Sequence, residues 1–456
     1  MYPPLVRRLV FPLHERFCRR PTLRRLRELE RSQWMDPQAL IELQETRLRQ
    51  LVRGAAGRVP YYRRQFERAG MRSRDIERFD LGDLARLPTL SKDDIRRNIN
   101  ALQDPAALHH RIPSTTGGST GQPLQFYIDR ARQAADQAAR ARTRRWFGID
   151  LGERELYLWG APVELSSQDR FKSVRDRLIN HRLISAFNMT PRTMARHLDV
   201  IQRFNPVHLF GYPSSLARLV RYARATGRRF ANPALRAVFT TGEWLNPADR
   251  AAIEEAVPCP VADGYGAREA GFIAHQCPAG SYHIAMEGVI VEVLDPRGRP
   301  LSNGEIGEIT ITNLDAWAMP FIRYRTGDLG ALRAAPCSCG RGLTCLDVVA
   351  GRRTDMLRTT EGGAAHALSV LYVLREQPGI VQYQVIQQTD LSLDVRVVAD
   401  STLTAQSHSL LASKLASCIG AGTPVRIHRV DRIDAATSGK HRSVISLASE
   451  TPPHRP

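Results

Sequence analysis

The stretch STTGGSTGQP, residues 114–123, joins three glycines to five hydroxyl side chains. Glycine admits close backbone approach and positive φ, while successive N–H groups and hydroxyls can point at one anion. A phosphate group is therefore the ligand that such a loop suits. The stretch lacks the G-x-x-x-x-G-K-[ST] pattern of P-loop proteins and the spacing of a dinucleotide fingerprint, and a surface turn would use the same residue types.

Three more stretches suit the same ligand. In DGYGAREAG, Glu269 follows a glycine-containing turn, where its carboxylate could hold Mg²⁺ against triphosphate oxygens. In YRTGDLG, Asp328 could accept hydrogen bonds from ribose hydroxyls, and in GRR, Arg352 stands beside a glycine. Alone, each of these residues is typical of a helix cap or a surface turn, so only their combination predicts a nucleotide site.

The order and spacing of six motifs are more specific: STTGGSTGQP, TTGEWL, YGAREAG, YRTGDLG, GRRTDM and the terminal SGKHR. Together they resemble the adenylate-forming superfamily of acyl-CoA synthetases, adenylation domains and luciferases, and most of all its phenylacetate-CoA ligase branch with the capsule-biosynthesis relatives. The resemblance begins near VPYYRRQFERAG and runs to the C-terminus. It implies a large α/β adenylate-forming domain over 1–353, which includes an N-terminal helical segment over 1–70, and a small mobile α+β lid domain over 354–456.

The resemblance also assigns roles to residues. The glycine-rich loop would wrap the β and γ phosphates, Glu269 would bind Mg²⁺, and Asp328 would bind the ribose. Lys440 would be the catalytic lysine of the small domain, while Thr354 and Asp355 would form the hinge, where the family usually has two acids. The residues that would bind ATP are Thr115, Thr116, Gly117, Gly118, Ser119, Thr120, Gly121, Gly242, Glu243, Tyr265, Gly266, Asp328 and Arg352.

The implied reaction has two halves. A carboxylate attacks the α-phosphate of MgATP, which gives an acyl-adenylate and pyrophosphate, and Lys440 stabilises the charge that develops. The small domain then rotates and admits a nucleophile, most simply the thiol of coenzyme A. An amine or hydroxyl acceptor in cell-surface or secondary metabolism is the alternative, and a non-catalytic nucleic-acid-binding protein is the alternative from another class.

The acyl substrate is the least constrained part of this hypothesis. The resemblance implies an aryl or arylacetic acid. LWGAP and FGYPSS supply Trp159 and Tyr212 in the region where the relatives hold the acid, and both aromatic residues are equally typical of a packed core.

Sequence periodicity predicts the elements that must position these residues. Helices are expected over 22–34, 36–57 and 59–70, the second with Asp36 as its N-cap. From about residue 155, short apolar runs such as ELYLWG, VHLFGY and LRAVFTTG alternate with helical stretches, which indicates α/β architecture. The last hundred or so residues follow a helix, strand, strand, helix, strand order, which indicates a small α+β domain.

Composition and charge indicate which kinds of partner the chain can bind. The chain has 456 residues, 43% of them hydrophobic, and a net charge of +19. Because the positive charge is spread thinly, a nucleic-acid partner is not expected, although the Arg-rich N-terminus could form an amphipathic helix on a membrane or partner surface. Arginines interrupt that terminus before a signal-peptide core could form, and a cytoplasmic location is expected.

Seven cysteines, an odd number in a long chain, indicate reduced thiols rather than a disulfide framework. His275-x-Cys277 and Cys337-x-Cys339 form two ligand pairs about 60 residues apart, and Cys345 is a spare. Four such ligands could close a tetrahedral structural zinc site. The alternative is that these cysteines are small buried hydrophobic residues.

Overall fold

A computed structural model of the chain describes residues 2–116, 124–159, 175–186, 189–230, 232–245, 247–352, 356–358, 364–366, 370, 373–374, 377–400, 403, 405–419, 422–434 and 443–448. The chain divides into two compact units. The first comprises Met1–Thr326 and Gly330–Val349, and the second comprises Gly327–Leu329 and Ala350–Pro456.

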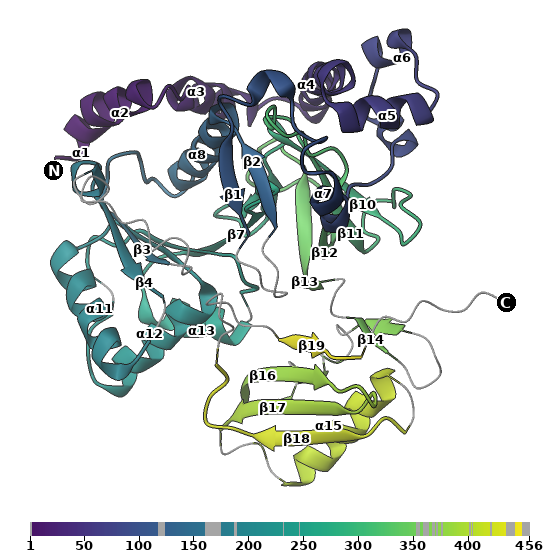
Figure 1. Ribbon diagram of the computed structural model, residues 1–456. Helices are drawn as coiled ribbons and strands as arrows, with labels where there is room; N and C mark the ends of the chain where they lie inside the picture. Colours follow the sequence, from purple (N-terminus) through teal and green to yellow (C-terminus); the bar gives the residue numbers. More distant parts are fainter. Residues whose placement is uncertain are drawn as a thin grey trace. The chain divides into compact units, whose positions relative to one another are not determined.

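An 11-stranded sheet dominates the first unit, in the order β10-β11-β12-β13-β9-β8-β7-β6-β5-β3-β4 (Figure 1). Strands β4, β3, β5, β6 and β7 are parallel, whereas β7–β8, β8–β9, β13–β9 and β10–β11 are antiparallel pairs. Strands β1 and β2 form a separate antiparallel hairpin. The strand bounds are β1 Ile112–Thr115, β2 Gln125–Ile128, β3 Glu155–Trp159, β4 His181–Ser185, β5 His208–Gly211, β6 Ala237–Thr241, β7 Val261–Ala267, β8 Gly271–Gln276, β9 Tyr282–Ile284, β10 Val289–Leu294, β11 Gly307–Asn313, β12 Tyr324–Leu332 and β13 Cys345–Arg352.

The helices of the first unit begin with an N-terminal series that the sequence predicts well. Asp36 accepts a hydrogen bond from the N–H of Ala39 (3.0 Å) and caps the longest helix, and Gly70 follows the next one with φ +66°. The helix bounds are α1 Pro3–Leu5, the π-helical turn η1 Val6–Val10, α2 Phe11–Phe17, α3 Thr22–Ser32, α4 Pro37–Arg58, α5 Pro60–Arg68, α6 Ser73–Glu77, α7 Lys92–Asn98, α8 Arg130–Arg145, α11 Pro191–Phe204, α12 Pro213–Ala225 and α13 Pro247–Ala256, with 3₁₀ turns η2 Gly82–Arg86 and η3 Pro105–Ala107.

Helices α11, α12 and α13 lie beside the parallel strands (Figure 1). Leu198 of α11 and Leu216 of α12 belong to one buried cluster with Leu158 of β3, Leu209 of β5 and Val238 of β6. The sheet is therefore fixed from one side by amphipathic helices, and the carboxyl ends of its parallel strands share one edge. That edge is where ligands bind in open α/β sheets.

The second unit has its own sheet, in the order β18-β17-β16-β19. Strands β16 and β17 are antiparallel, whereas β16–β19 and β17–β18 are parallel pairs. A separate short hairpin joins β14 and β15. The bounds are β14 Met356–Arg358, β15 Ala364–His366, β16 Ile380–Gln387, β17 Leu393–Ala399, α15 Ala405–Ile419, β18 Val425–Arg429 and β19 Val444–Ser446. The α+β character predicted for the C-terminal residues is confirmed, and the α/β character of the large part is confirmed as well.

Candidate active site

The β1–β2 hairpin carries the glycine-rich loop. The N–H of Thr116 donates to Leu124 O (3.0 Å), and the N–H of Leu124 donates to Thr116 Oγ1 (2.9 Å). These two bonds close the hairpin at the base of the loop, so Thr115 and Thr116 have defined positions. Gly117, Gly118, Ser119, Thr120 and Gly121 lie outside the described residues.

The turn between β7 and β8 lies next to that base. Arg268 donates from Nη1 to Thr115 O (3.1 Å), and Arg132 donates to Arg268 O (2.9 Å). A Cβ at Gly266 would lie 2.6 Å from Gly271 O, so only glycine allows the two strands to approach this closely. The glycines of YGAREAG therefore shape a tight turn that holds Arg268 and Glu269 near the base of the loop.

Glu269 is almost fully buried in this turn, with 6% of its surface exposed. Tyr324, the first residue of β12, donates its hydroxyl hydrogen to Glu269 Oε1 (2.8 Å). Lys92 Nζ, at the start of α7, lies 3.8 Å from the same oxygen. The carboxylate is thus oriented by a hydroxyl and has an ammonium group close by.

A second group of predicted residues meets at the carboxyl edge of the parallel strands. Trp159 ends β3 and Tyr212 follows β5, and their rings stack with centroids 4.1 Å apart and planes 22° apart. Gly242, which follows β6, has φ +81°, and a Cβ there would lie 3.1 Å from Tyr212 and 3.4 Å from Trp159. Glycine at this position therefore allows the backbone after β6 to lie directly against both rings.

The two aromatic residues differ in exposure. Tyr212 is 1% exposed and belongs to the hydrophobic core, whereas Trp159 is half-buried. Burial and the nearby Glu243 carboxylate raise the pKa of the Tyr212 phenol. Glu243 itself accepts a hydrogen bond from the N–H of Ser214 (3.2 Å) and so lies at the N-terminus of α12.

The remaining predicted nucleotide residues are placed on strands β7, β12 and β13. Tyr265 of β7 donates from its hydroxyl to Thr326 Oγ1 (3.4 Å). Asp328 lies on β12 two residues later, in the part of that strand that groups with the second unit. Arg352 ends β13, and nothing is described of its side chain. Lys440, Thr354 and Asp355 lie outside the described residues.

A buried carboxyl group lies deeper on β7. Asp263 accepts hydrogen bonds from Thr240 Oγ1 (2.5 Å) and the Tyr282 hydroxyl (2.7 Å). Burial raises the pKa of Asp263 to about 6, although both donors oppose that shift. Asp263 therefore links β7 to β6 through Thr240 and to β9 through Tyr282.

The predicted metal ligands are only partly correct. Cys277, Cys337 and Cys339 come together as expected, but the histidine that joins them is His283 and not His275. The His275 ring packs against Phe239 and Phe272, and its Nδ1 lies 2.8 Å from Gln276 O. Its place in the aromatic core keeps it out of the cluster, while β9 brings His283 to the cysteines.

Two polar residues of the site were not singled out from the sequence. Tyr324 lies in the YRTGDLG motif and Lys92 lies outside the six motifs, and each meets Glu269 through a long-range contact. Lysine is scarce in this chain, with four among the 65 basic residues, so the lone lysine near the first motif was an available signal.

Two threonines at the base of a hairpin, a buried acid near them, and glycine and aromatic residues at the carboxyl edge of a parallel sheet fit an enzyme that binds a nucleotide. Comparison with known proteins agrees. The AMP-binding enzyme family matches residues 181–315, and the CapK C-terminal domain matches residues 357–447. The chain belongs to the adenylate-forming enzymes, in the branch that contains the phenylacetate-CoA ligases and CapK.

The similar proteins cover most of the chain. Phenylacetate-coenzyme A ligase of Thermus thermophilus is 28% identical over 372 residues, which is 77% of this chain and 79% of that protein. Protein CapK of Staphylococcus aureus is 22% identical over 413 residues, with 89% of each chain covered. The fold matches a crystal structure of 2-hydroxyisobutyryl-CoA ligase in the postadenylation state with a TM-score of 0.73, 21% identity and 91% coverage of both chains.

Proposed function

We propose that this adenylate-forming ligase converts an aryl or arylacetic acid and MgATP to an acyl-adenylate and pyrophosphate, and then transfers the acyl group to coenzyme A. The observation that carries the proposal is the stacked pair of Trp159 and Tyr212, which packs against Gly242 at the carboxyl edge of the parallel strands. Flat aromatic surfaces favour a planar aryl group, which can stack on them or meet them edge-on. Trp159 would offer the accessible ring, and Tyr212 would support it from the core.

The nucleotide would lie along the turn between β7 and β8 and along the glycine-rich loop. Thr115, Thr116 and the glycines that follow would donate hydrogen bonds to the β and γ phosphates. The Glu269 carboxylate has the donor atoms that Mg²⁺ prefers, and the bound ion would offset phosphate charge. Lys92, close to Glu269, would add a positive charge on the same side.

The other assigned residues would complete catalysis. Tyr265 and Gly266 would border the adenine together with Gly242 and Glu243, while Asp328 would accept hydrogen bonds from the ribose. Three further roles depend on the resemblance alone. Lys440 would stabilise charge at the α-phosphate, Arg352 would bind the ribose or a phosphate, and Thr354 with Asp355 would form the hinge.

A second acceptor deserves a separate test because the C-terminal match is to the CapK C-terminal domain. That domain contains the predicted catalytic lysine, and in adenylate-forming enzymes it would change position before the second half-reaction. An amine or hydroxyl acceptor in cell-surface polysaccharide or secondary metabolism is therefore the alternative to coenzyme A. The activation of the acid is the same in both.

Pyrophosphate release from MgATP tests the proposal with a panel of aryl, arylacetic and fatty acids, each with and without coenzyme A. We expect release to require an aryl or arylacetic acid, and mass spectrometry to find its thioester only when coenzyme A is present. Release with these acids but without a thioester would exclude coenzyme A as the acceptor. A preference for fatty acids would contradict the proposed substrate class.

A further inference from the structure

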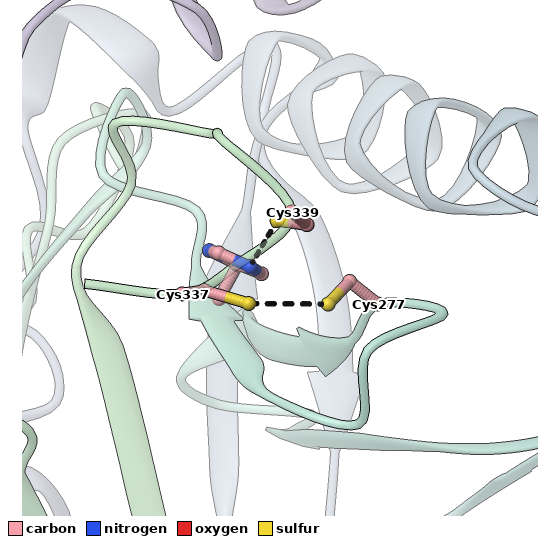
Figure 2. A group of neighbouring side chains, drawn as sticks. Cys277, Cys337 and Cys339 are labelled. Carbon is pink, nitrogen blue, oxygen red and sulfur yellow. Dashed lines mark hydrogen bonds between the residues drawn. The ribbon is translucent and has the colours of Figure 1, made fainter. Parts of the chain in front are cut away.

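Three cysteines and one histidine form a cluster that includes none of the residues assigned to the candidate active site. The ligand atoms of Cys277, His283, Cys337 and Cys339 all lie within 4.8 Å of one another. Cys277 Sγ is 3.7 Å from Cys337 Sγ (Figure 2), and Cys339 Sγ is 3.1 Å from His283 Nε2. Zinc–sulfur bonds of about 2.3 Å in a tetrahedron place two sulfurs roughly 3.8 Å apart. We propose that these four residues bind a structural zinc ion.

The histidine is prepared for this role. His283 Nδ1 lies 3.1 Å from Leu343 O, a backbone carbonyl that can only accept a hydrogen bond. Nδ1 therefore carries the proton, and the lone pair of Nε2 points toward the cysteines. A hydrogen bond of this kind fixes the tautomer and the ring orientation of histidine ligands in zinc proteins.

The backbone around the cysteines also forms tight turns. Gly280 donates its N–H to Cys277 O (2.8 Å), and Gly340 donates to Cys337 O (3.3 Å). Both glycines have positive φ, +82° and +78°, which a side chain would strain. Each turn folds the chain back beside its cysteine, as a compact ligand loop requires.

The site is closed, which makes its role structural. Cys277, Cys337 and His283 are at most 8% exposed, and four protein ligands fill a tetrahedral zinc ion without leaving a position for substrate. Cys345 is also buried nearby, but its Sγ lies 3.6 Å from His283 Nδ1, the protonated side of the ring. Cys345 is therefore outside the ligand set and offers a matched control.

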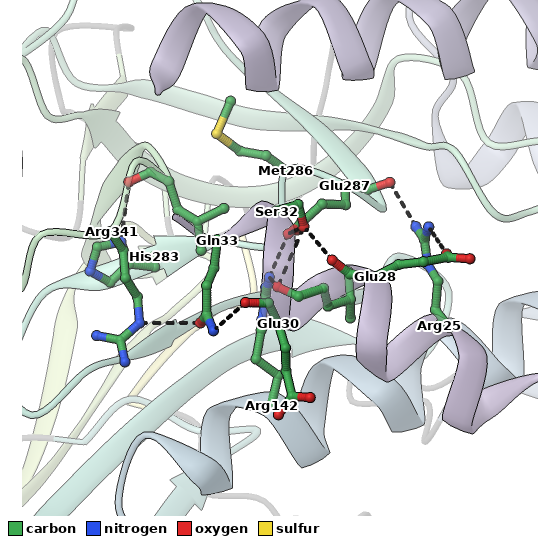
Figure 3. A network of polar contacts seen from close by, with 12 residues as sticks. Arg25, Glu28, Glu30, Ser32, Gln33, Arg142, His283, Met286, Glu287 and Arg341 are labelled. Carbon is green, nitrogen blue, oxygen red and sulfur yellow. Dashed lines mark hydrogen bonds and ion pairs between the residues drawn. The ribbon is translucent and has the colours of Figure 1, made fainter. Parts of the chain in front are cut away.

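The loop over 337–345 carries two of the four ligands and also contacts the N-terminal helices. The Arg341 guanidinium lies over the rings of Trp34 (4.9 Å) and Trp146 (4.6 Å). Gly342 donates its N–H to Gln33 O (3.0 Å), and Gln33 Oε1 accepts from Trp146 Nε1 (2.7 Å). Figure 3 shows Arg341, Gln33 and His283 side by side in this network. Zinc would thus hold Cys277, after β8, and His283, on β9, to a loop that contacts the segment between α3 and α4.

Zinc content and its dependence on single cysteines test the site. We expect about one zinc per chain in wild-type protein purified without chelators, and the same content in Cys345→Ser. Cys339→Ser should lose most of the metal and be cleaved faster by protease within the N-terminal helices. Wild-type protein with far less than one zinc, or equal loss of zinc in Cys345→Ser, would overturn the proposal.

Cobalt replacement keeps the test independent of variant folding. Wild-type protein reloaded with Co²⁺ should show thiolate-to-cobalt charge-transfer absorption together with the visible bands of a tetrahedral ion. An octahedral spectrum without charge transfer, or a Cys277–Cys337 disulfide found by mass spectrometry in protein purified under reducing conditions, would contradict a zinc site.

A separate observation concerns the outer face of the N-terminal helix. Leu5, Leu9, Leu13 and Phe17 recur every four residues and are 45%, 51%, 56% and 89% exposed. The opposite face is fixed to the protein, because Arg7 pairs with Asp150 (2.5 Å). The apolar stripe is thereby held outward in a defined orientation.

The charged residues around the apolar stripe of Leu5, Leu9, Leu13 and Phe17 indicate which surface it contacts. Arg8, Arg16 and Arg19 are exposed on the same segment, and its single acid, Glu15, is buried against Arg20. We propose that α1 to α2 lie in the surface of a bilayer that contains anionic phospholipid. Within the described residues, no helix has the length and apolar character needed to cross a membrane, so the contact would be interfacial.

Co-sedimentation with vesicles tests this contact. The full chain should sediment with vesicles of phosphatidylglycerol and phosphatidylcholine, less with phosphatidylcholine alone, and less at high salt. The double variant Leu9→Glu/Leu13→Glu should lose at least about tenfold in binding. Ile306→Glu, at a distant residue that is 56% exposed, should bind as the wild type does. Absence of binding to anionic vesicles, or concentration-dependent self-association abolished by the double variant, would overturn the proposal.

Discussion

Tyr324 donates its hydroxyl hydrogen to Glu269 Oε1 over 2.8 Å, and this bond joins the first residue of β12 to the turn between β7 and β8. The bond holds a buried carboxylate beside the base of the glycine-rich loop. Two motifs that are 55 residues apart in the chain therefore form one site.

Glu269→Gln should slow acid-dependent pyrophosphate release by about 100-fold, because the amide removes the negative charge proposed for Mg²⁺. Tyr324→Phe leaves the carboxylate in place but unoriented, so it should raise the Mg²⁺ concentration needed for half-maximal rate by about tenfold. Glu305→Gln, at an exposed acid, is the control. Equal rates in Glu269→Gln and Glu305→Gln would remove Glu269 from the mechanism.

Gly242→Ala should raise the KM for the aryl acid about tenfold or more, because the new methyl group would contact the Trp159 and Tyr212 rings. Gly304→Ala is a matched control, since Gly304 has a similar φ of +88° and open space around its Cβ position. Both substitutions should cost roughly 1–2 kcal/mol of stability through the strained φ. A KM that is unchanged in Gly242→Ala would contradict the proposed place of the acid.

Lys440→Ala should reduce adenylate formation by at least about 100-fold and leave ATP binding nearly unchanged. The reason is that its ammonium group is proposed to stabilise charge that develops only as the acid attacks. Lys414→Ala, at an exposed lysine on α15, should retain the wild-type rate. Single-turnover formation of the adenylate, measured beside nucleotide binding by calorimetry, separates the two effects, and a wild-type rate would exclude the assigned role.

Arg142→Met should destabilise the protein by about 3–5 kcal/mol, because it leaves a buried carboxylate without its cation. Arg142 Nη1 lies 2.6 Å from Glu287 Oε1, the two side chains are 1% and 2% exposed, and Ser32 Oγ donates to the same oxygen (2.5 Å) (Figure 3). The double variant Arg142→Met/Glu287→Met should recover part of the loss. Urea denaturation measures both, and a single-variant loss below about 1 kcal/mol would show that the pair contributes little.

Acid should destabilise the fold through His208. Burial lowers the pKa of this histidine to about 4, although the Glu155 carboxylate opposes the shift. The native state therefore keeps His208 neutral, while the unfolded chain takes up a proton near pH 6.5. The contribution of His208 to the free energy of unfolding is complete above that pH. Up to about 3 kcal/mol of this contribution is lost as the pH falls toward 4.

Thermal unfolding at about pH 7 and about pH 5 checks this dependence. His208→Gln should show a smaller fall in Tm than the wild type, whereas His110→Gln, at an exposed histidine, should fall as the wild type does. An identical fall in all three proteins would assign the acid sensitivity to other groups.

Helix caps, glycine stops and short apolar runs predicted many helices and strands correctly, because the ends of these elements depend on residues that are close in the chain. Asp36 and Pro37 mark the start of α4, and Gly70 marks the end of α5, as their residue types imply. The strand runs around Leu158, Leu209 and Val238 became neighbours in one parallel sheet. Their order in that sheet depends on packing between distant segments, which periodicity does not contain.

The metal cluster shows where sequence spacing fails. His275 is two residues from Cys277 in the chain, yet the aromatic core around Phe272 holds its ring. His283 reaches the cysteines because β9 pairs with both β8 and β13. The pairing of strands decides which histidine is a ligand. Lys92, on α7, and Tyr324, on β12, likewise meet Glu269 through packing between segments that are distant in the chain.

Exchange of labelled pyrophosphate into ATP is the most direct measurement of acid adenylation, since it requires no acyl acceptor. We predict exchange that depends on Mg²⁺ and on an aryl or arylacetic acid, continues without coenzyme A, and disappears in Lys440→Ala. Exchange that is absent with every acid, or equal with and without acid, would contradict the central claim that this chain activates a carboxylic acid as its adenylate.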